Sequence, residues 1–262
     1  MTLPTFFISH GAPDLPIRTG PTQDFLRQLL ASLPEQPTAM LVISAHWLTD
    51  QPTLSTNPQP QTIYDFGGFP PHLSELVYRA PGSPTLAKRV AELLAEAGFA
   101  PQFNSDRGYD HGAWTPLILM SPAGQIPVTL LSLQPQETPA HHLHLGKALA
   151  CLRDEGVLII GSGAATHNMA AFNSDYHAAP PAWAIEFDTW LAKAIDQNDL
   201  AALLNYRQVA PHAERNHPTD EHLLPLFVAL GAGGQGHQVN QGFTYGAFSM
   251  AVYQFDGCWM DS

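Results

Sequence analysis

Histidine is the residue type in this sequence with the greatest potential for chemistry. The chain contains 13 histidines, more than its 11 lysines and arginines together, and they form no His-rich tract. Three of them follow short apolar runs: His10 follows TFFIS, His46 follows MLVISA and His167 follows VLIIGSGAAT. Imidazole is the commonest metal-binding side chain and also exchanges protons near neutral pH. The pattern favours a metal centre or acid–base catalysis, although no local ligand motif of the HExxH kind fixes the geometry.

Two further histidine clusters lie near the starts of expected helical segments. His111 belongs to DHGAW, and His217 and His222 belong to NHPTDEH. Each cluster also has a structural interpretation, in which Asp110 or His111 caps the first segment and Asn216 or Thr219 caps the second. For one histidine alone that interpretation is the better one, whereas histidines at five element ends favour a shared site. The other seven are expected mostly at the surface: His72, His141, His142, His144, His177, His212 and His237.

Short apolar runs alternate with amphipathic segments along the chain, which predicts an α/β fold. Strands are expected at residues 3–9, 39–45, 126–133, 157–160 and 245–255, and helices at 22–33, 84–97, 140–153, 183–195, 200–206 and 219–230. We expect a single domain over residues 1–262 with a central, mostly parallel mixed sheet flanked by helices. Open sheets of this kind bind ligands at the carboxyl ends of their strands, where His10, His46 and His167 are expected to meet.

Composition narrows the functional classes. The 262 residues are 45% hydrophobic and 13% charged, which suits one sizeable domain. Twenty-three acidic residues against 11 basic ones give a net charge of -12, so nucleic acid and membrane surfaces are unfavourable partners. No apolar run approaches the roughly 18–20 residues of a membrane span, and the N-terminus lacks a basic segment, so we expect a cytoplasmic protein. Cys151 and Cys258 are too few for a disulfide framework or a thiolate metal site.

Six motifs occur in order along the chain: SHGAP, SAHW, YDFGGFP, DHGAWTPL, GSGAATHN and NHPTDEHLLPL. As a set they resemble the class III extradiol ring-cleaving dioxygenases, in particular the DOPA 4,5-dioxygenase-like branch. The resemblance spans nearly the whole chain. It implies insertion of O2 into a small catechol such as L-DOPA, with 4,5-cleavage, at one histidine-bound metal ion.

The same resemblance implies that His10, His46 and His222 bind the metal. His217 is the alternative third ligand, but it precedes Pro218 and is biased toward extended backbone, whereas His222 is expected just inside a helix. In the protocatechuate branch the third ligand resembles a glutamate, and here it is histidine. Three histidines also describe a common catalytic zinc site, so one divalent ion per chain is expected, Fe(II) for catalysis or Zn(II) as bound.

Two other histidines match catalytic positions of the family. The resemblance implies that His167 takes a proton from the bound catechol and that His111 donates a hydrogen bond on the oxygen side. His167 is alternatively a fourth ligand. The YDFGGFP and DHGAW segments are expected to form an aromatic wall around the catechol ring. The alternative interpretation is that these aromatic residues anchor a loop to the core. The expected wall consists of Tyr64, Asp65, Phe66, Tyr109 and Trp114.

Two other functions remain open from the sequence. A zinc-dependent hydrolase would use the three histidines with a nearby base. A non-catalytic peptide-binding module of related fold would keep similar histidines without ring cleavage. The expected partners are a small catechol and O2, and the chain is expected to be a monomer or a small homo-oligomer.

Overall fold

A computed structural model describes residues 1–257, so Cys258 lies outside the described residues. Its main sheet has eight strands in the order β4-β3-β5-β2-β6-β1-β10-β7, and β8 pairs with β9 in a separate ribbon. The strands are β1 Thr5–Ser9, β2 Ala39–Leu48, β3 Thr53–Ser55, β4 Gln102–Asn104, β5 Val128–Leu133, β6 Val157–Gly163, β7 Gly236–Asn240, β8 Phe243–Thr244, β9 Phe248–Ser249 and β10 Val252–Phe255.

The centre of the sheet is parallel. Strands β5, β2, β6 and β1 are parallel neighbours, while β10 pairs antiparallel with both β1 and β7. On the other side β3 is antiparallel to β5 and parallel to β4. The structure confirms the expected single α/β domain with a mostly parallel mixed sheet. It also shows that β6 lies between β1 and β2, a neighbour relation that the sequence alone does not give.

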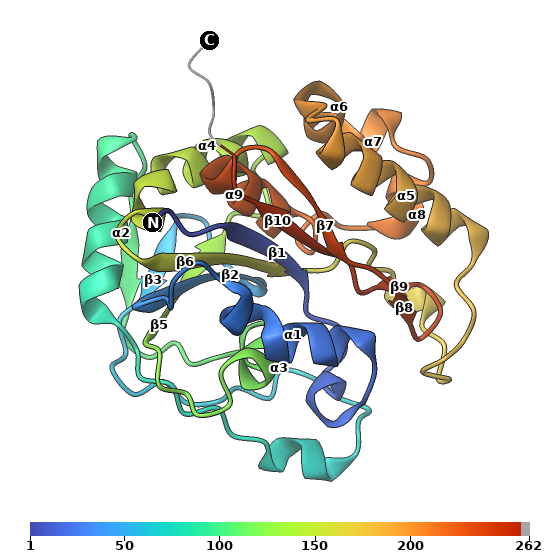
Figure 1. The fold of residues 1–262 in the computed structure, drawn as a ribbon, viewed down its shortest axis with the longest axis horizontal. Helices are drawn as coiled ribbons and strands as arrows, with labels where there is room; N and C mark the ends of the chain where they lie inside the picture. The colour runs from blue at the N-terminus through green and yellow to red at the C-terminus, as the bar shows by residue number, and fades with distance from the viewer. Residues whose placement is uncertain (258–262) are drawn as a thin grey trace.

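Helices cover both faces of the sheet (Figure 1). They are α1 Pro21–Ser32, α2 Pro84–Glu96, α3 His111–Met120, α4 Pro139–Ala148, α5 Ala182–Asp196, α6 Leu200–Leu204, α7 Tyr206–Val209, α8 Ala213–Asn216 and α9 Leu224–Gly233. Short 3-10 helices occupy Leu15–Ile17, Pro71–Glu75, Ala150–Arg153 and Met169–Ala171. One core lies between the sheet and α2, α4, α5 and α9, and the other lies beneath α1 and α3.

The central strands are continuous apolar runs because both of their faces are buried. In β1, Phe7 packs into the core under α9, whereas Phe6 and Ile8 point into the core under α1 and α3. Side chains alternate between faces along a strand, so consecutive residues are buried on opposite sides and the runs are mostly apolar, with small hydroxyl residues such as Thr5 and Ser9 at their ends. This is why the strands at residues 3–9, 39–45, 126–133 and 157–160 could be recognised from the sequence.

Helix α2 shows how local signals set the ends of an element. Ser83 is its N-cap and accepts a hydrogen bond from the amide of Leu86, and Pro84 occupies the first turn. Gly98 follows the helix with a φ of +88°, a conformation that glycine adopts at little cost. The expected helix at residues 84–97 is therefore confirmed to within one residue.

Some expected elements differ from the structure. The helix expected at 219–230 begins only at Leu224, because residues 221–223 form a turn. His222 therefore lies just before the helix and not inside it. The strand expected at 245–255 is interrupted, since Tyr245 has a φ of +51° and only β9 and β10 are extended. The short strands β3, β4 and β7 carry too few apolar residues to give a periodic signal.

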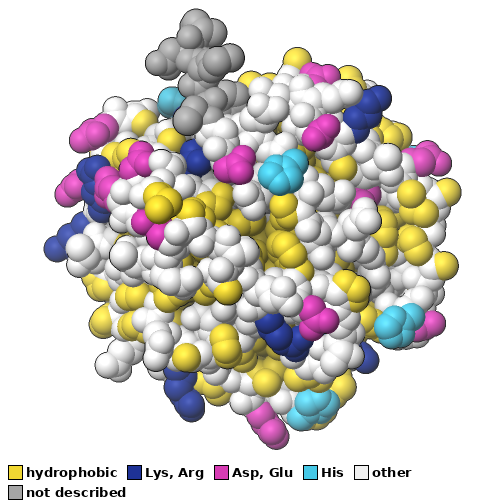
Figure 2. All heavy atoms as spheres, viewed as in Figure 1, with side chains coloured by type: hydrophobic (Ala, Val, Ile, Leu, Met, Phe, Trp, Pro, Cys, Tyr) yellow, Lys and Arg dark blue, Asp and Glu magenta, His cyan; other side chains and the backbone are white. Residues whose placement is uncertain are grey.

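No helix in residues 1–257 combines the length and apolar character that crossing a membrane requires. On the face of the molecule in Figure 2, the lysine and arginine side chains are scattered and form no continuous patch.

Two glycines in β6 allow another backbone to approach the sheet. A Cβ atom on Gly161 would lie 2.2 Å from the carbonyl oxygen of Pro225, and one on Gly163 would lie 2.1 Å from that of His222. Both distances are far below van der Waals contact, and the obstructing atoms belong to backbone. The chain leading into α9 can therefore rest directly on the end of β6.

We predict that Gly161→Ala and Gly163→Ala each lower the free energy of unfolding by about 1–3 kcal/mol, because the added methyl group overpacks this contact. Gly67→Ala is the matched control, since a Cβ there meets nothing within 4 Å. Chemical denaturation of the three variants measures the difference. Equal stability of all three would contradict the close packing of β6 against this segment.

Candidate active site

Three neighbouring strands deliver three of the histidines to one edge of the sheet. His10 follows β1, His46 lies near the end of β2, and His167 follows β6, which runs between them. The amide of His10 donates a hydrogen bond to the carbonyl of Gly163, 2.9 Å away, which holds the end of β1 against the end of β6. Strand β2 continues past its expected end to Leu48, with a register shift after Ile43 relative to β5.

His222 reaches the same place from a segment distant in sequence. Its carbonyl accepts a hydrogen bond from the amide of Ala164, 2.9 Å away, at the end of β6. The absence of a side chain on Gly163 permits this approach. The amides of Leu223 and Leu224 then bond to the carbonyl of Asp220, which starts the turn into α9.

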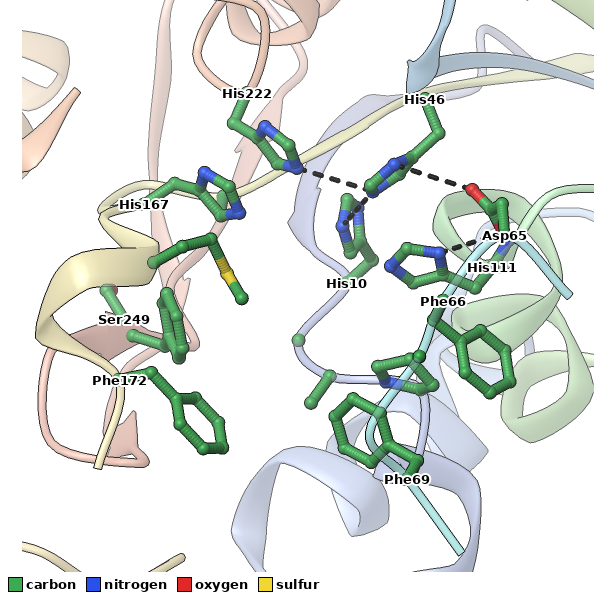
Figure 3. Close-up of a pocket in the computed structure, with 17 residues that line it drawn as sticks. His10, His46, Asp65, Phe66, Phe69, His111, His167, Phe172, His222 and Ser249 are labelled. Carbon is green, nitrogen blue, oxygen red and sulfur yellow. Dashed lines mark hydrogen bonds and ion pairs between the residues drawn. The ribbon is translucent and has the colours of Figure 1, made fainter. Parts of the chain in front are cut away.

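The three imidazoles of His10, His46 and His222 point their Nε2 atoms toward one another (Figure 3). The Nε2 atom of His46 lies 3.2 Å from that of His10 and 3.3 Å from that of His222. Nitrogen ligands about 2.0–2.1 Å from one metal ion lie about 2.9–3.4 Å apart in tetrahedral or octahedral geometry. The separations in the structure fit one shared ion.

The opposite nitrogen of each ring faces an oxygen. Nδ1 of His10 lies 3.1 Å from Ser162 Oγ, and Nδ1 of His222 lies 3.0 Å from Glu221 Oε1. Nδ1 of His46 lies 3.5 Å from Asp65 Oδ2. Carboxylates accept hydrogen bonds and cannot donate them when ionised, so they favour the proton on Nδ1.

The serine has the same effect on its histidine. Ser162 Oγ donates its own proton to the carbonyl of Gly112, so it is left to accept from Nδ1–H of His10. With the proton on Nδ1, each of the three Nε2 atoms carries a lone pair and no proton. These lone pairs face one another. A bound cation would resolve this repulsion, and neutral imidazole with Nδ1 hydrogen-bonded is the usual form of a metal-ligating histidine.

Burial keeps these histidines neutral. Desolvation is the main cause that lowers the pKa of His46 to about 4, and the neighbouring His111 lowers it further. The pKa values of His10 and His222 are also lowered, first by burial and then by the surrounding histidines. At neutral pH the three Nε2 atoms are therefore not occupied by protons that a metal ion would have to displace.

His167 lies beside this trio. Its ring stacks on that of His222 with centroids 3.4 Å apart and planes 7° apart. Its amide donates a hydrogen bond to the carbonyl of Asn216, 3.0 Å away, which fixes the segment after β6. Burial lowers the pKa of His167 to about 4, so it too is neutral and able to accept a proton.

His111 lies on the other side of His46, with ring centroids 3.9 Å apart. It is the first residue of α3, where Asp110 caps the helix by accepting a hydrogen bond from the amide of Ala113. Nδ1 of His111 lies 3.0 Å from Asp65 Oδ1. The helix cap interpretation and a place at the histidine cluster are therefore both realised within the DHGAW segment.

A cavity of about 260 Å³ opens over the cluster. Its polar side consists of the five histidines described above together with Asp65 and Ser249, and its other walls are largely apolar. Phe66 and Phe69 line one side of the open space and Phe172 lies across from them (Figure 3). No lysine or arginine is among the described residues that line this cavity. The remaining lining residues are Gly11, Ala12, Pro13, Gly67, Ala164, Met169 and Phe248.

The structure separates the expected wall residues into two groups. Asp65 and Phe66 line the cavity, whereas Tyr64, Tyr109 and Trp114 are not among its described lining residues. Tyr109 and Trp114 are fully buried behind the wall. Trp114 Nε1 donates to the carbonyl of Ile63 at 3.1 Å, and Tyr64 Oη donates to that of Leu76 at 3.0 Å. These three residues hold the loop in place, which is the second interpretation that the sequence left open.

His217 lies away from the cluster. It is fully buried, its Nε2 bonds to the carbonyl of Ala165 at 2.9 Å, and its ring packs against Phe187 and Tyr206. His142, expected at the surface, is also fully buried, with Nδ1 bonded to the carbonyl of Thr138 at 2.9 Å.

Several residues of the site had no assignment from the sequence. Ser162 and Glu221 adjoin recognised motif positions and could have been found by asking what supports each histidine. Phe69 stands in the FGGFP segment beside Phe66. Phe172 and Phe248 belong to no motif, and their place in the cavity depends on the path of two distant loops.

Comparison with known proteins gives a consistent result. Residues 4–256 match the family described as the catalytic LigB subunit of aromatic ring-opening dioxygenase. A 4,5-DOPA dioxygenase extradiol of Beta vulgaris is 45% identical over 258 residues, covering 96% of each chain. One of Escherichia coli is 34% identical, covering 96% of this chain and 94% of the relative.

A solved structure shares the fold. The crystal structure of an uncharacterized protein from Escherichia coli K12 superposes with a TM-score of 0.81 at 31% identity, covering 97% of this chain and 99% of the other. The match to the family extends over nearly the whole chain, and the resemblance seen in the six motifs is confirmed. The chain therefore belongs to the LigB family of aromatic ring-opening dioxygenases and is an extradiol ring-opening enzyme that depends on a divalent metal.

Proposed function

We propose that residues 1–262 act as one catalytic domain that opens the ring of a small catechol at a single metal ion held by His10, His46 and His222. The observation that carries this ligand set is the convergence of three Nε2 atoms at the base of the cavity, where that of His46 lies 3.2 Å from that of His10 and 3.3 Å from that of His222. Three protein ligands leave coordination positions open, which substrate binding requires.

We propose Fe(II) as the catalytic ion. Bound Fe(II) would supply a redox-active centre that brings the catechol oxygens and O2 together, chemistry that redox-inactive Zn(II) does not provide. Glu221 and Asp65 would balance part of its charge, since each carboxylate faces the Nδ1 atom of one ligand histidine. The three proposed ligands are neutral histidines and include no carboxylate. The two carboxylates next to them would supply the negative charge that a carboxylate ligand would otherwise provide.

The cavity would hold the catechol ring between apolar walls. Phe66 and Phe172 provide aromatic surfaces on two sides, and burial of the ring against them excludes water from the reacting carbons. The open side is formed in part by Met169 and Phe172, which are 64% and 39% exposed. A substituent on the ring would point toward this mouth.

We propose that His167 accepts a proton from a catechol hydroxyl. Its burial keeps the imidazole neutral and therefore able to act as a base. The stacking of its ring on His222 holds it next to the proposed ligand set. His111 would act on the opposite side, where its Nδ1 is held by Asp65 and its Nε2 is left to form a hydrogen bond with oxygen.

L-DOPA is the substrate indicated by the names of the relatives. Because no lysine or arginine is among the described lining residues, we propose that the ring and its two oxygens supply most of the binding. The amino-acid group would remain at the solvated mouth.

Oxygen uptake tests this function. Protein reconstituted anaerobically with Fe(II) is expected to consume one O2 per catechol and to form a yellow semialdehyde-type product, whereas zinc-loaded protein is not. A charge-assisted hydrogen bond to the carboxylate of L-DOPA would contribute about 1.5–3 kcal/mol, which is more than tenfold in kcat/KM. Because no lysine or arginine is among the described lining residues to form it, L-DOPA and 4-methylcatechol are expected to differ in kcat/KM by less than about tenfold. Absence of uptake with L-DOPA, protocatechuate, catechol and caffeate would contradict the proposal.

The ligand assignment is tested by His222→Ala. We expect this variant to lose both the metal and ring cleavage, because it removes one of three converging nitrogens. His217→Ala is the matched control from the same segment and is expected to lose stability but to keep one metal ion per chain. Metal analysis after desalting, together with activity, measures both. Full activity in His222→Ala would disprove the ligand set.

The role of His167 is tested by His167→Ala. We expect the metal content to stay at one ion per chain and kcat to fall by about 10²- to 10⁴-fold, the range for loss of a general acid or base. Metal analysis and steady-state kinetics separate the alternatives. Loss of the metal in this variant would instead identify His167 as a fourth ligand.

A further inference from the structure

The Asp65 carboxylate uses both of its oxygens on two histidines with different expected roles. We propose that Asp65 is a positioning residue that orients the proposed ligand His46 and the oxygen-side residue His111 together, and that it does not bind substrate directly. This inference rests on the proposed function for the roles of the two histidines. The contacts themselves are features of the structure.

Oδ1 of Asp65 holds His111 at two points. It accepts hydrogen bonds from the backbone amide at 2.9 Å and from ring Nδ1 at 3.0 Å. Two bonds from one residue to one oxygen fix both the start of α3 and the rotation of the imidazole. The Nδ1 proton is committed to Asp65, so Nε2 of His111 is the nitrogen left free to act in the cavity.

Oδ2 of Asp65 faces His46. It lies 3.5 Å from Nδ1, on the side of the ring opposite to the converging Nε2 atoms. An acceptor in this position keeps the proton on Nδ1 and the lone pair on Nε2. Figure 3 shows the carboxylate beside the neighbouring rings of His46 and His111, with dashed lines to both.

Both oxygens of Asp65 are engaged, Oδ1 by the amide and ring Nδ1 of His111 and Oδ2 by Nδ1 of His46. A carboxylate whose two oxygens both face imidazole nitrogens has little capacity left for a ring hydroxyl. Its position in the cavity lining is therefore better explained by support of the two histidines.

The loop is anchored just before Asp65. The amide of Ile63 donates to the carbonyl of Tyr109 at 2.7 Å, and Tyr64 Oη donates to Leu76. Phe66 follows directly and lines the cavity. The carboxylate thus joins the aromatic wall to the histidine cluster, and the hydrogen bonds of Ile63 and Tyr64 hold the loop that carries both.

Asp65→Asn tests this role because it keeps the size of the side chain and changes its hydrogen bonding. A carboxamide has one oxygen acceptor and one NH2 donor, so it cannot accept from Nδ1–H of both His46 and His111. We expect metal affinity to weaken by about 10- to 100-fold, the usual effect of losing an outer partner of a ligand histidine. We also expect kcat at saturating Fe(II) to fall, since His111 loses its orientation.

The experiment measures metal affinity by competition titration of Zn(II) against a chelator, and separately kcat and KM for L-DOPA at saturating Fe(II). His111→Gln is the comparison variant and is expected to lower kcat with metal affinity within about threefold of the wild-type value. Asp106 is an exposed residue in the loop before α3. Asp106→Asn is therefore the control, and it is expected to change neither metal affinity nor kcat. Asp65→Glu is expected to recover part of the metal affinity. Thermal unfolding verifies that each variant is folded.

The outcomes are distinguishable. Weaker metal binding together with lower kcat in folded Asp65→Asn supports the positioning role. Unchanged metal affinity overturns it, and an effect confined to KM assigns Asp65 to substrate binding, as the sequence predicted. If the wild-type enzyme cleaves no catechol, the proposed function fails, while the titration still decides whether Asp65 supports the metal ligands.

Discussion

Three imidazole nitrogens with unprotonated lone pairs face one another at the end of the sheet, and the rest of the site depends on holding them there. The Nε2 atoms of His10, His46 and His222 lie 3.2–3.3 Å apart along the two contacts with His46. Like-oriented lone pairs repel, so the arrangement persists only because the surrounding structure fixes each ring. Ser162, Glu221 and Asp65 do so from outside, each by facing one Nδ1 atom.

The fold supplies this constraint through parallel strands and close backbone contact. Strand β6 between β1 and β2 brings the ends of all three strands together, and Gly163 at the end of β6 lets the carbonyl of His222 approach. Burial by the surrounding protein lowers the pKa of these histidines and keeps them in the neutral form. The proposed metal binding, proton transfer and enclosure of the ring thus all depend on one arrangement of strand ends.

Much of this arrangement could be predicted from the sequence, because buried strands are continuous apolar runs and their carboxyl ends share one edge. That rule predicts that His10, His46 and His167 lie together. His222 is also in the cluster, but the prediction that it lies inside a helix is wrong, since α9 begins after it, at Leu224. Its position depends on the contact with β6. Trp114 carries an aromatic signal yet lies behind the wall, because periodicity does not tell a lining ring from an anchoring one.

The most direct test of the account is the position of the metal ion in crystals of protein reconstituted with Fe(II) or Zn(II), measured by anomalous diffraction at the absorption edge. The account predicts one peak per chain, about 2.0–2.2 Å from the Nε2 atoms of His10, His46 and His222. Two other groups offer ligand atoms within 4.8 Å of one another, His46 with Asp65 and His111, and His167 with Glu221 and His222. A peak at either of those groups, or no peak among the three Nε2 atoms, would contradict it.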